Sequence, residues 1–166
     1  MVICVVGAAQ AATPSPTQQR NAQQIVNIDI TTHLGDQQVF LEHDVISFYF
    51  SLDQDAFLYV FYRDATGNVF QLMPGTAQTK HYFMAGYYIP FPAQSSSFKF
   101  VVESPFGEEQ LWVFASEQGQ LVFNGKDTAQ GIKQLEQDYA ELAESIKSVS
   151  TKLFGKARLS IQTRRR

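Results

Sequence analysis

The sequence predicts a mainly β fold: an immunoglobulin-like antiparallel β-sandwich of about seven or eight strands, with one C-terminal amphipathic helix and a final edge strand. Three observations carry this prediction. Residues 55–74 read as an apolar hairpin, several other segments alternate apolar with polar residues, and a single helical stripe follows near the C-terminus.

The composition fits one domain and argues against a polyanionic partner. A chain of 166 residues suits a single domain with an ordinary core. The formal net charge of −3 gives no basic surface, so nucleic acid is not an expected partner. The chain contains 14 Phe and 7 Tyr, more rings than one core needs, and some are therefore expected at the surface.

The N-terminus has the pattern of an export signal. Residues 1–11 combine a short apolar run with the small-x-small sequence Ala9-Gln10-Ala11, which predicts a partial secretion signal and a periplasmic or secreted protein. An ordinary N-terminus is the alternative. Cys4 lies inside this segment, so cleavage leaves a chain without cysteine. Residues 12–24 are predicted to form a flexible linker, and residues 25–166 the domain.

The first strands follow from alternation. Residues 26–31 and 46–52 alternate apolar with polar side chains, as strands with one buried face do. Residues 56–62 are apolar on both faces and predict a central strand that is covered on each side. The turn Asp64-Ala65-Thr66-Gly67 returns the chain into the hairpin partner at residues 68–73. Further strands are expected at residues 82–89, 98–103 and 108–115, with a possible short one at 121–123.

A change of period near the C-terminus predicts a helix over about residues 128–154. Apolar residues recur there at steps of three and four, from Ile132 and Leu135 to Leu153. Asp127 with Gln130 is the expected capping box, and Gly155 is the expected stop. Alternation over 157–163 predicts the last strand. The stripe is expected to pack on the protein's own sheet, and pairing with another chain as an oligomer is the alternative.

Residues suited to catalysis or metal binding are sparse. His33, His43 and His81 have no zinc-type spacing, and the sequence contains no nucleophile elbow and no phosphate-binding glycine loop. Asp53, Asp55 and Asp64 flank strands, where a side-chain bond to the backbone explains them better than calcium does. Glu108 and Glu109 fit a solvated turn. We therefore expect no enzyme, no cofactor and no metal site.

Aromatic residues are the candidate interaction site. Residues 82–91 hold more ring surface than one strand face can bury, and Phe106 lies at a Pro-Phe-Gly turn. The candidate contact residues are Tyr82, Phe83, Tyr87, Tyr88, Phe91 and Phe106. Burial of alternate rings in the core is the competing interpretation. The Arg164–Arg166 tail is read as a solvated end, with anionic lipid or peptidoglycan contact as a lesser option.

Residues 38–116 resemble a bacterial family described as a domain of unknown function, number four-three-eight-four. The shared features are an aromatic strand ending in Tyr62-Arg63, an L-x-P stop at residues 72–74, an A-G-x-x-x-P strand at 85–90, and a Pro-x-Gly turn at 105–107 before a V-x-A strand. The resemblance implies an exported β-sandwich module with an accessory or sensing role, and it carries over no catalytic residues.

These observations together favour a noncatalytic periplasmic protein-binding module, acting as a component or adaptor of a cell-envelope assembly such as a secretion or surface apparatus. A module that binds cell-wall glycan or peptidoglycan is the alternative, and an enzyme is less favoured. No run reaches the about 20 apolar residues of a membrane-spanning helix, so protein partners in the envelope are expected without a membrane span.

Overall fold

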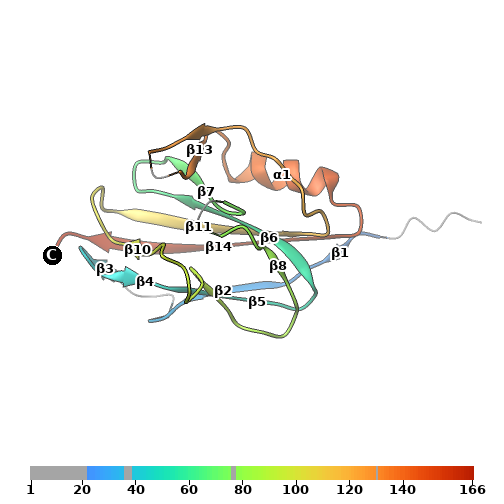
Figure 1. Cartoon of the computed structure of the whole chain (residues 1–166), viewed down its shortest axis with the longest axis horizontal. Coiled ribbons are helices and arrows are strands. Elements are labelled where there is room, and N and C mark those ends of the chain that lie inside the picture. The colour runs from blue at the N-terminus through green and yellow to red at the C-terminus, as the bar shows by residue number, and fades with distance from the viewer. Residues whose placement is uncertain (1–21, 36–38, 76–77, 130) are drawn as a thin grey trace, which may run out of the picture.

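The computed structural model describes residues 22–35, 39–75, 78–129 and 131–166, and this part of the chain is mainly β with one helix. Figure 1 shows three levels: α1 (Tyr139–Val149) above, the large sheet with β11 and β14 in the middle, and β2 with β5 below. The predicted mainly β class and single helix are confirmed, in a sandwich-like layout with the helix as an added outer layer.

The large sheet has nine strands in the order β1-β14-β11-β6-β7-β13-β12, with β3 also on β14 and β8 also on β6. Its pairings are antiparallel except those of β1 and β3 with β14, which are parallel. The strands are β1 (Gln24–Ile25), β3 (Val39–Leu41), β6 (Ala56–Arg63), β7 (Val69–Met73), β8 (Tyr82–Phe83), β11 (Glu108–Ser116), β12 (Lys126–Asp127), β13 (Lys133–Leu135) and β14 (Leu153–Arg164).

Two smaller antiparallel sheets complete the β portion. One has the order β2-β5-β9 and the other pairs β4 with β10. Their bounds are β2 (Ile28–Thr32), β4 (Val45–Ile46), β5 (Phe48–Leu52), β9 (Ile89–Phe91) and β10 (Phe100–Val101). The strand expected at 26–31 is present as β2, and the one expected at 46–52 is divided between β4 and β5, which belong to different sheets. Those expected at 82–89 and 98–103 are shorter or divided.

The first core lies between the large sheet and the three-stranded sheet. Phe48 and Phe50 of β5 are fully buried against residues of β6 and β11, such as Leu58 and Val113. Alternation in these strands sends every second side chain into this layer. The period-two pattern of the sequence therefore identified this core correctly.

The second core lies on the other face of the large sheet, under α1. Tyr59 and Phe61 of β6 and Phe114 of β11 pack there with Leu142 and Ile146 of the helix. Both helix side chains are fully buried, which stabilises the fold by about 1.5–3 kcal/mol for each. β6 is covered on both faces, as its continuous apolar run predicts. The helix packs on its own sheet, which was the favoured expectation.

The predicted helix over 128–154 is wrong in its bounds, because α1 spans only Tyr139–Val149. Leu135 lies in β13, where it pairs with Val69 of β7. Ile132 packs against the first core and Leu135 belongs to the second, so the two residues face opposite ways. A helix would place residues three apart on one face, and strand pairing here overrides the helical pattern.

Both predicted helix boundaries need correction too. The capping box is formed by Asp138 and Glu141, whose side chains each accept a bond from the other's backbone N–H at 2.9 Å. Asp127 lies in β12, and Gln130 falls outside the described residues. The helix ends at Ser150, whose hydroxyl donates to the Ile146 carbonyl at 2.7 Å. These caps were not predicted, because the apolar stripe of the sequence continues past them on both sides.

Gly155 has a different role from the predicted helix stop. It lies in β14 opposite Ala115. A Cβ at this position would collide with the carbonyl oxygen and side chain of Val26, so the close approach of the chain after β1 requires glycine. The last strand, predicted at 157–163, begins earlier and spans Leu153–Arg164. It is not a free edge, since β1 and β3 pair with its two ends.

The strand predicted at 82–89 is two strands in different sheets. β8 pairs with β6 in the large sheet, and β9 pairs with β5 in the three-stranded sheet. A turn at Gly86, with a positive φ of 81°, takes the chain across. The possible strand at 121–123 does not form. Instead the Leu121 N–H donates to the Tyr59 hydroxyl, at 3.3 Å.

The predicted signal at 1–11 lies outside the described residues, as does most of the predicted linker. The end of that linker is ordered, because the Gln23 side chain donates to the Ser150 carbonyl and Gln24 begins β1. The part of the chain that the structure describes contains no helix long and apolar enough to cross a bilayer.

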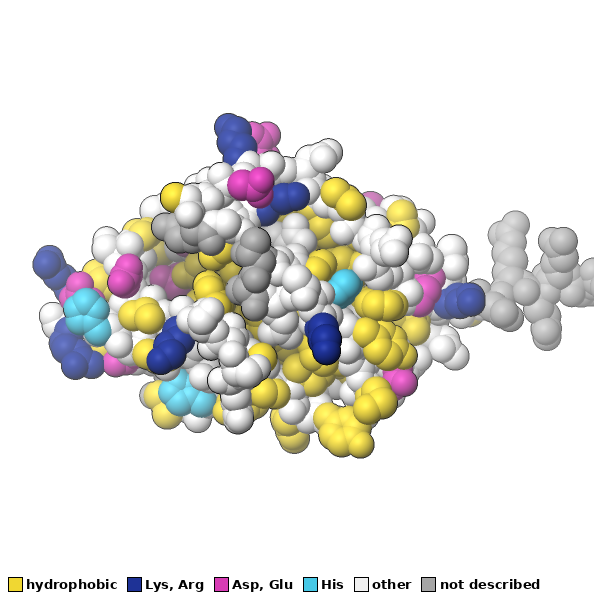
Figure 2. Space-filling model, viewed as in Figure 1, with side chains coloured by type: hydrophobic (Ala, Val, Ile, Leu, Met, Phe, Trp, Pro, Cys, Tyr) yellow, Lys and Arg dark blue, Asp and Glu magenta, His cyan; other side chains and the backbone are white. Residues whose placement is uncertain are grey.

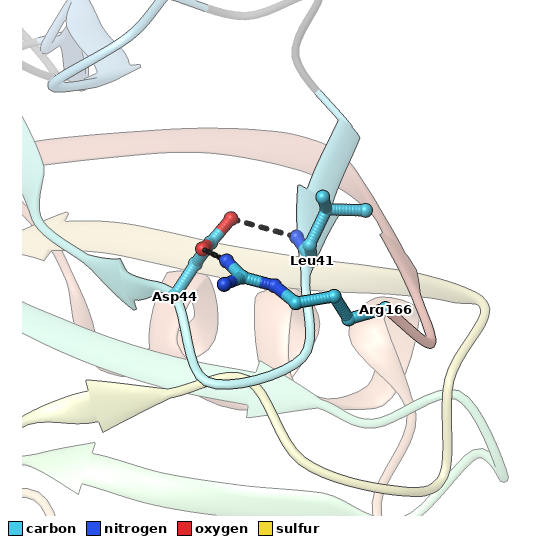
Figure 3. A network of polar contacts seen from close by, with 3 residues as sticks. All are labelled: Leu41, Asp44 and Arg166. Atoms are coloured by element: carbon cyan, nitrogen blue, oxygen red, sulfur yellow. Dashed lines mark hydrogen bonds and ion pairs between the residues drawn. The ribbon is translucent and has the colours of Figure 1, made fainter.

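The basic C-terminus lies beside the β3–β4 turn, and its three arginines are exposed, as expected for a solvated end. The Asp44 carboxylate accepts from the Leu41 N–H at 2.8 Å and from the Arg166 guanidinium at 2.9 Å, as Figure 3 shows. Arg165 lies 3.9 Å from the Glu42 carboxylate. Two of the three arginines thus have an acidic neighbour while they remain exposed to solvent.

Candidate functional site

The structure separates the six candidate contact residues into exposed tyrosines and buried or half-buried phenylalanines. Tyr82, Tyr87 and Tyr88 are 53%, 63% and 72% exposed. Phe91 is buried in the first core, where it stacks on Phe50 with ring centroids 5.6 Å apart, so it leaves the candidate surface.

Phe83 and Phe106 are half-buried and pack against the first core. Their rings contribute to the fold rather than to an open surface, which was the competing interpretation in sequence analysis. Met84 was not among the candidate residues, yet it is 58% exposed between the tyrosines. We call the four exposed residues Tyr82, Met84, Tyr87 and Tyr88 the tyrosine patch.

The patch lies on the β8–β9 connection, and backbone bonds fix this connection at two points. The Gly86 N–H donates to the Leu52 carbonyl at 3.0 Å. The Ala85 N–H donates to the Asp55 carboxylate at 2.8 Å. A carboxylate acceptor makes a strong bond to a backbone donor. The loop therefore presents its tyrosines from an anchored backbone, and Asp55 has a structural role in that anchoring.

A layer of rings supports the patch from below. Tyr82 contacts Phe57 with centroids 4.9 Å apart, and His81 lies 5.2 Å from Phe57 and 5.4 Å from Tyr59. The two ring nitrogens of His81 lie 3.0 and 3.1 Å from the carbonyl oxygens of Thr79 and Gly119. His81 thus ties the strand to a distant segment, and it is half-buried rather than solvated.

Figure 2 shows hydrophobic side chains gathered over the β8–β9 connection on the face in view. Tyrosine side chains combine an apolar ring with a hydroxyl that donates and accepts hydrogen bonds. Such a surface can bury large area against a protein or stack on a sugar ring at low entropic cost. Its chemistry is that of binding.

The three aspartates considered for calcium are not brought together. Asp53 accepts from the Asn27 backbone N–H at 2.8 Å, and Asp55 accepts from the Ala85 N–H of the β8–β9 connection. Asp64 lies at the other end of β6 and caps its own turn, accepting from the Thr66 and Asn68 N–H groups at 2.9 and 2.8 Å. Among the described residues, no group of three or more His, Cys, Asp or Glu is placed to hold a metal ion.

Glu109 is not part of a solvated turn, as sequence analysis expected. It is only 6% exposed, and its carboxylate accepts from the Tyr62 hydroxyl at 2.6 Å and the Thr163 hydroxyl at 2.9 Å. Burial raises the pKa of Glu109, the two hydroxyl bonds oppose this, and the nearby charge of Asp64 adds to the rise. Burial, with the Glu109 bond and charge, also raises the pKa of Tyr62.

The sequence did contain a signal for the burial of Glu109. It occupies the same alternation register as Leu111, Val113 and Ala115 of β11, which all belong to the first core. A strand that continues this register places Glu109 on the buried face and Glu108 on the exposed one.

A separate groove of about 660 Å³ runs between residues 121–126, β13 and α1. Its apolar lining includes Leu121, Val122 and Val149, and Val122 is 84% exposed. It contains none of the residues that sequence analysis singled out as contacts.

Comparison with known proteins supports the resemblance. Residues 39–119 match the sequence model of the family described as domain of unknown function (DUF4384). The matched segment runs from β3 to just beyond β11, so it contains the tyrosine patch and Glu109 but not α1 or β14. No curated protein and no solved structure matches the chain.

Proposed function

We propose that the protein is a noncatalytic periplasmic protein-binding module that acts as a component or adaptor of a bacterial cell-envelope assembly, such as a secretion or surface apparatus. The observation that carries this proposal is the tyrosine patch. Three tyrosines and one methionine are more than half exposed on β8 and on the loop after it, whose backbone is anchored to β5 and to Asp55. Export is supported by the sequence pattern of residues 1–11 alone.

A protein partner accounts best for this surface. Tyrosine is enriched at the energetically dominant centres of protein interfaces, and methionine is enriched at interfaces as well. An anchored loop loses little conformational entropy on binding, so more of the contact energy contributes to affinity. The neighbouring rings of Tyr87 and Tyr88 also favour a second candidate, a cell-wall glycan that stacks on them.

The experiment that tests the proposal is crosslinking and recovery of a tagged full-length protein from intact cells. Three proteins are compared: wild type, Tyr87→Ala/Tyr88→Ala, and Leu34→Ala/Val45→Ala. The last is a matched control, because Leu34 and Val45 are 55% and 48% exposed but lie toward the opposite end of β5 from the patch. We expect envelope proteins that are recovered by wild type and the control and lost with the tyrosine variant.

Purified peptidoglycan supplies the second arm of the experiment. Sedimentation of wild type with peptidoglycan, lost in the tyrosine variant, together with no protein crosslinks, would transfer the function to the glycan alternative. Equal recovery of the same proteins by all three versions would remove the patch from the proposal.

A further inference from the structure

A cavity of about 200 Å³ opens at the end of the molecule where the C-terminus lies, away from the tyrosine patch. β6, β7, β10 and β11 contribute to its wall. Three carboxyl groups and three aromatic rings line it, together with smaller side chains. The acidic cavity is defined by Tyr62, Asp64, Phe70, Phe100, Glu103 and Glu109.

The rings of the acidic cavity form a continuous aromatic wall. The Tyr62 ring lies 6.4 Å from Phe70 in a stacked arrangement and 5.4 Å from Phe100 edge to face. All three side chains are half-buried, and all three line the cavity. Aromatic faces of this kind attract organic cations through the ring quadrupole.

The carboxyl groups of the cavity have no positive partner among the described residues. Two arginines at this end pair elsewhere, Arg165 with Glu42 and Arg166 with Asp44. None of the described residues that line the cavity is basic. Of the three carboxyl groups, Glu109 has the greatest need of a positive partner. It is more than nine-tenths buried, and its carboxylate accepts hydrogen bonds from neutral hydroxyl groups.

We propose that the acidic cavity binds an organic ammonium cation, with Glu109 as its main charge partner and the rings of Tyr62, Phe70 and Phe100 as the surface around its alkyl groups. A cation at this position would neutralise the buried charge and relieve the repulsion between Glu109 and Asp64. A neutral ligand of the same shape would make the apolar contacts with the rings but would leave the negative charge of the carboxylate without a positive partner. This site is independent of the tyrosine patch, and each can fail without the other.

The test is a titration of the ¹⁵N-labelled full chain with n-butylammonium chloride, followed by amide chemical shifts. Sodium chloride at equal concentration controls for ionic strength, and n-butanol controls for apolar contact alone. We expect saturable shifts at the amides of Phe100, Val101 and Glu109, with n-butanol producing much smaller ones. Raising the salt concentration should weaken the binding, because the attraction is partly electrostatic.

Three variants assign the binding to the cavity. Glu109→Gln keeps the shape and should weaken n-butylammonium binding by about tenfold or more, since a charged hydrogen bond is lost. Glu103→Gln changes an exposed lining residue that the fold does not need, and should weaken binding by a smaller factor. Glu108→Gln is the matched control, because its exposed side chain does not line the cavity, and should bind as wild type does.

The affinities of two further ligands show whether the ammonium group comes from a protein or from a small molecule. Tighter binding of Nα-acetyl-lysine methylamide indicates a lysine side chain of another protein, and tighter binding of choline indicates a small-molecule amine. Either result supports an ammonium site. Equal shifts with n-butanol, no saturable shift with any ammonium probe, or unchanged affinity in folded Glu109→Gln would overturn the proposal.

Discussion

Glu109 lies near the start of β11 and Glu117 directly follows its end, and the two carboxyl groups have opposite environments. Glu109 is held by two neutral hydroxyl groups, and burial raises its pKa. Burial also acts on Glu117, but backbone donors outweigh it and lower the pKa of that carboxyl. Those donors are the N–H groups of Thr151, Lys152 and Leu153, at 2.6, 2.9 and 3.1 Å. The ionised Glu109 carboxylate therefore destabilises the folded state, and the ionised Glu117 carboxylate stabilises it.

The raised pKa of Glu109 predicts a pH-dependent gain in stability for Glu109→Gln. The folded state binds this proton more tightly than the unfolded state, so the carboxyl costs stability as the pH rises from its ordinary pKa through the raised one. Relative to wild type, the variant should gain free energy of unfolding across that range and hold a constant advantage above it. Urea unfolding from about pH 4 to pH 8 measures this. Parallel stability curves would show that Glu109 titrates normally.

The lowered pKa of Glu117 predicts the opposite behaviour for Glu117→Gln. Here the stabilisation is fully present above the ordinary pKa of Glu and is lost as the pH falls through the lowered one. We expect the variant to lose about 1–2 kcal/mol at neutral pH, and to match wild type in acid. The same urea series checks this. A loss that persists unchanged at low pH would mean that shape, not charge, makes Glu117 important.

At the scale of elements, α1 contributes through its buried face rather than through its length. Leu142, Ala143 and Ile146 face the large sheet, while Val149 is 42% exposed. The helix is short for an independently stable one, so packing supplies most of its stability.

Truncating a buried side chain of α1 should lower the free energy of unfolding much more than truncating an exposed one. Leu142→Ala opens a cavity in the second core and should lower the free energy of unfolding by about 2–5 kcal/mol. Val149→Ala removes an exposed side chain from the same helix and should change it by no more than about 0.5 kcal/mol. Denaturant unfolding compares the two. Similar small losses in both would contradict the packing of α1 on its own sheet.

The elements also show what the sequence could predict. Local patterns are sufficient for β5, β6 and β11, since alternation or a continuous apolar run reports directly which faces are buried. They failed where distant pairing decides the outcome. Leu135 fits a helical stripe, yet its backbone pairs with β7, and Gly155 fits a helix stop, yet it makes room for Val26. Such contacts join residues far apart in the chain, and no local window contains them.

The candidate site divides in the same way. The surplus of rings in residues 82–91 correctly indicated exposed aromatic surface, and Tyr82, Tyr87 and Tyr88 supply it. The local sequence could not show that Phe91 is absent from the exposed surface, because its burial depends on the pairing of β9 with β5. The alternation register of β11 indicated that Glu109 is buried, but its two hydroxyl partners come from β6 and β14, and no local pattern identifies them.

At the scale of the whole molecule, the two proposed sites lie apart on one scaffold. The tyrosine patch is on the β8–β9 connection, and the acidic cavity is at the end where β14 and the chain finish (Figure 1). A fold covered on both faces of its main sheet holds both in fixed positions. Loss of one site is therefore expected to leave binding at the other unchanged.

The most direct test of the central claim is photo-crosslinking in intact cells, with a photoreactive phenylalanine analogue in place of Tyr88 in one strain and of Leu34 in another. Both side chains are exposed, so neither replacement should disturb the fold. The account predicts one discrete crosslinked envelope protein at position 88, absent at position 34. No crosslink at position 88, or the same products at both positions, would contradict the tyrosine patch as a protein-binding surface.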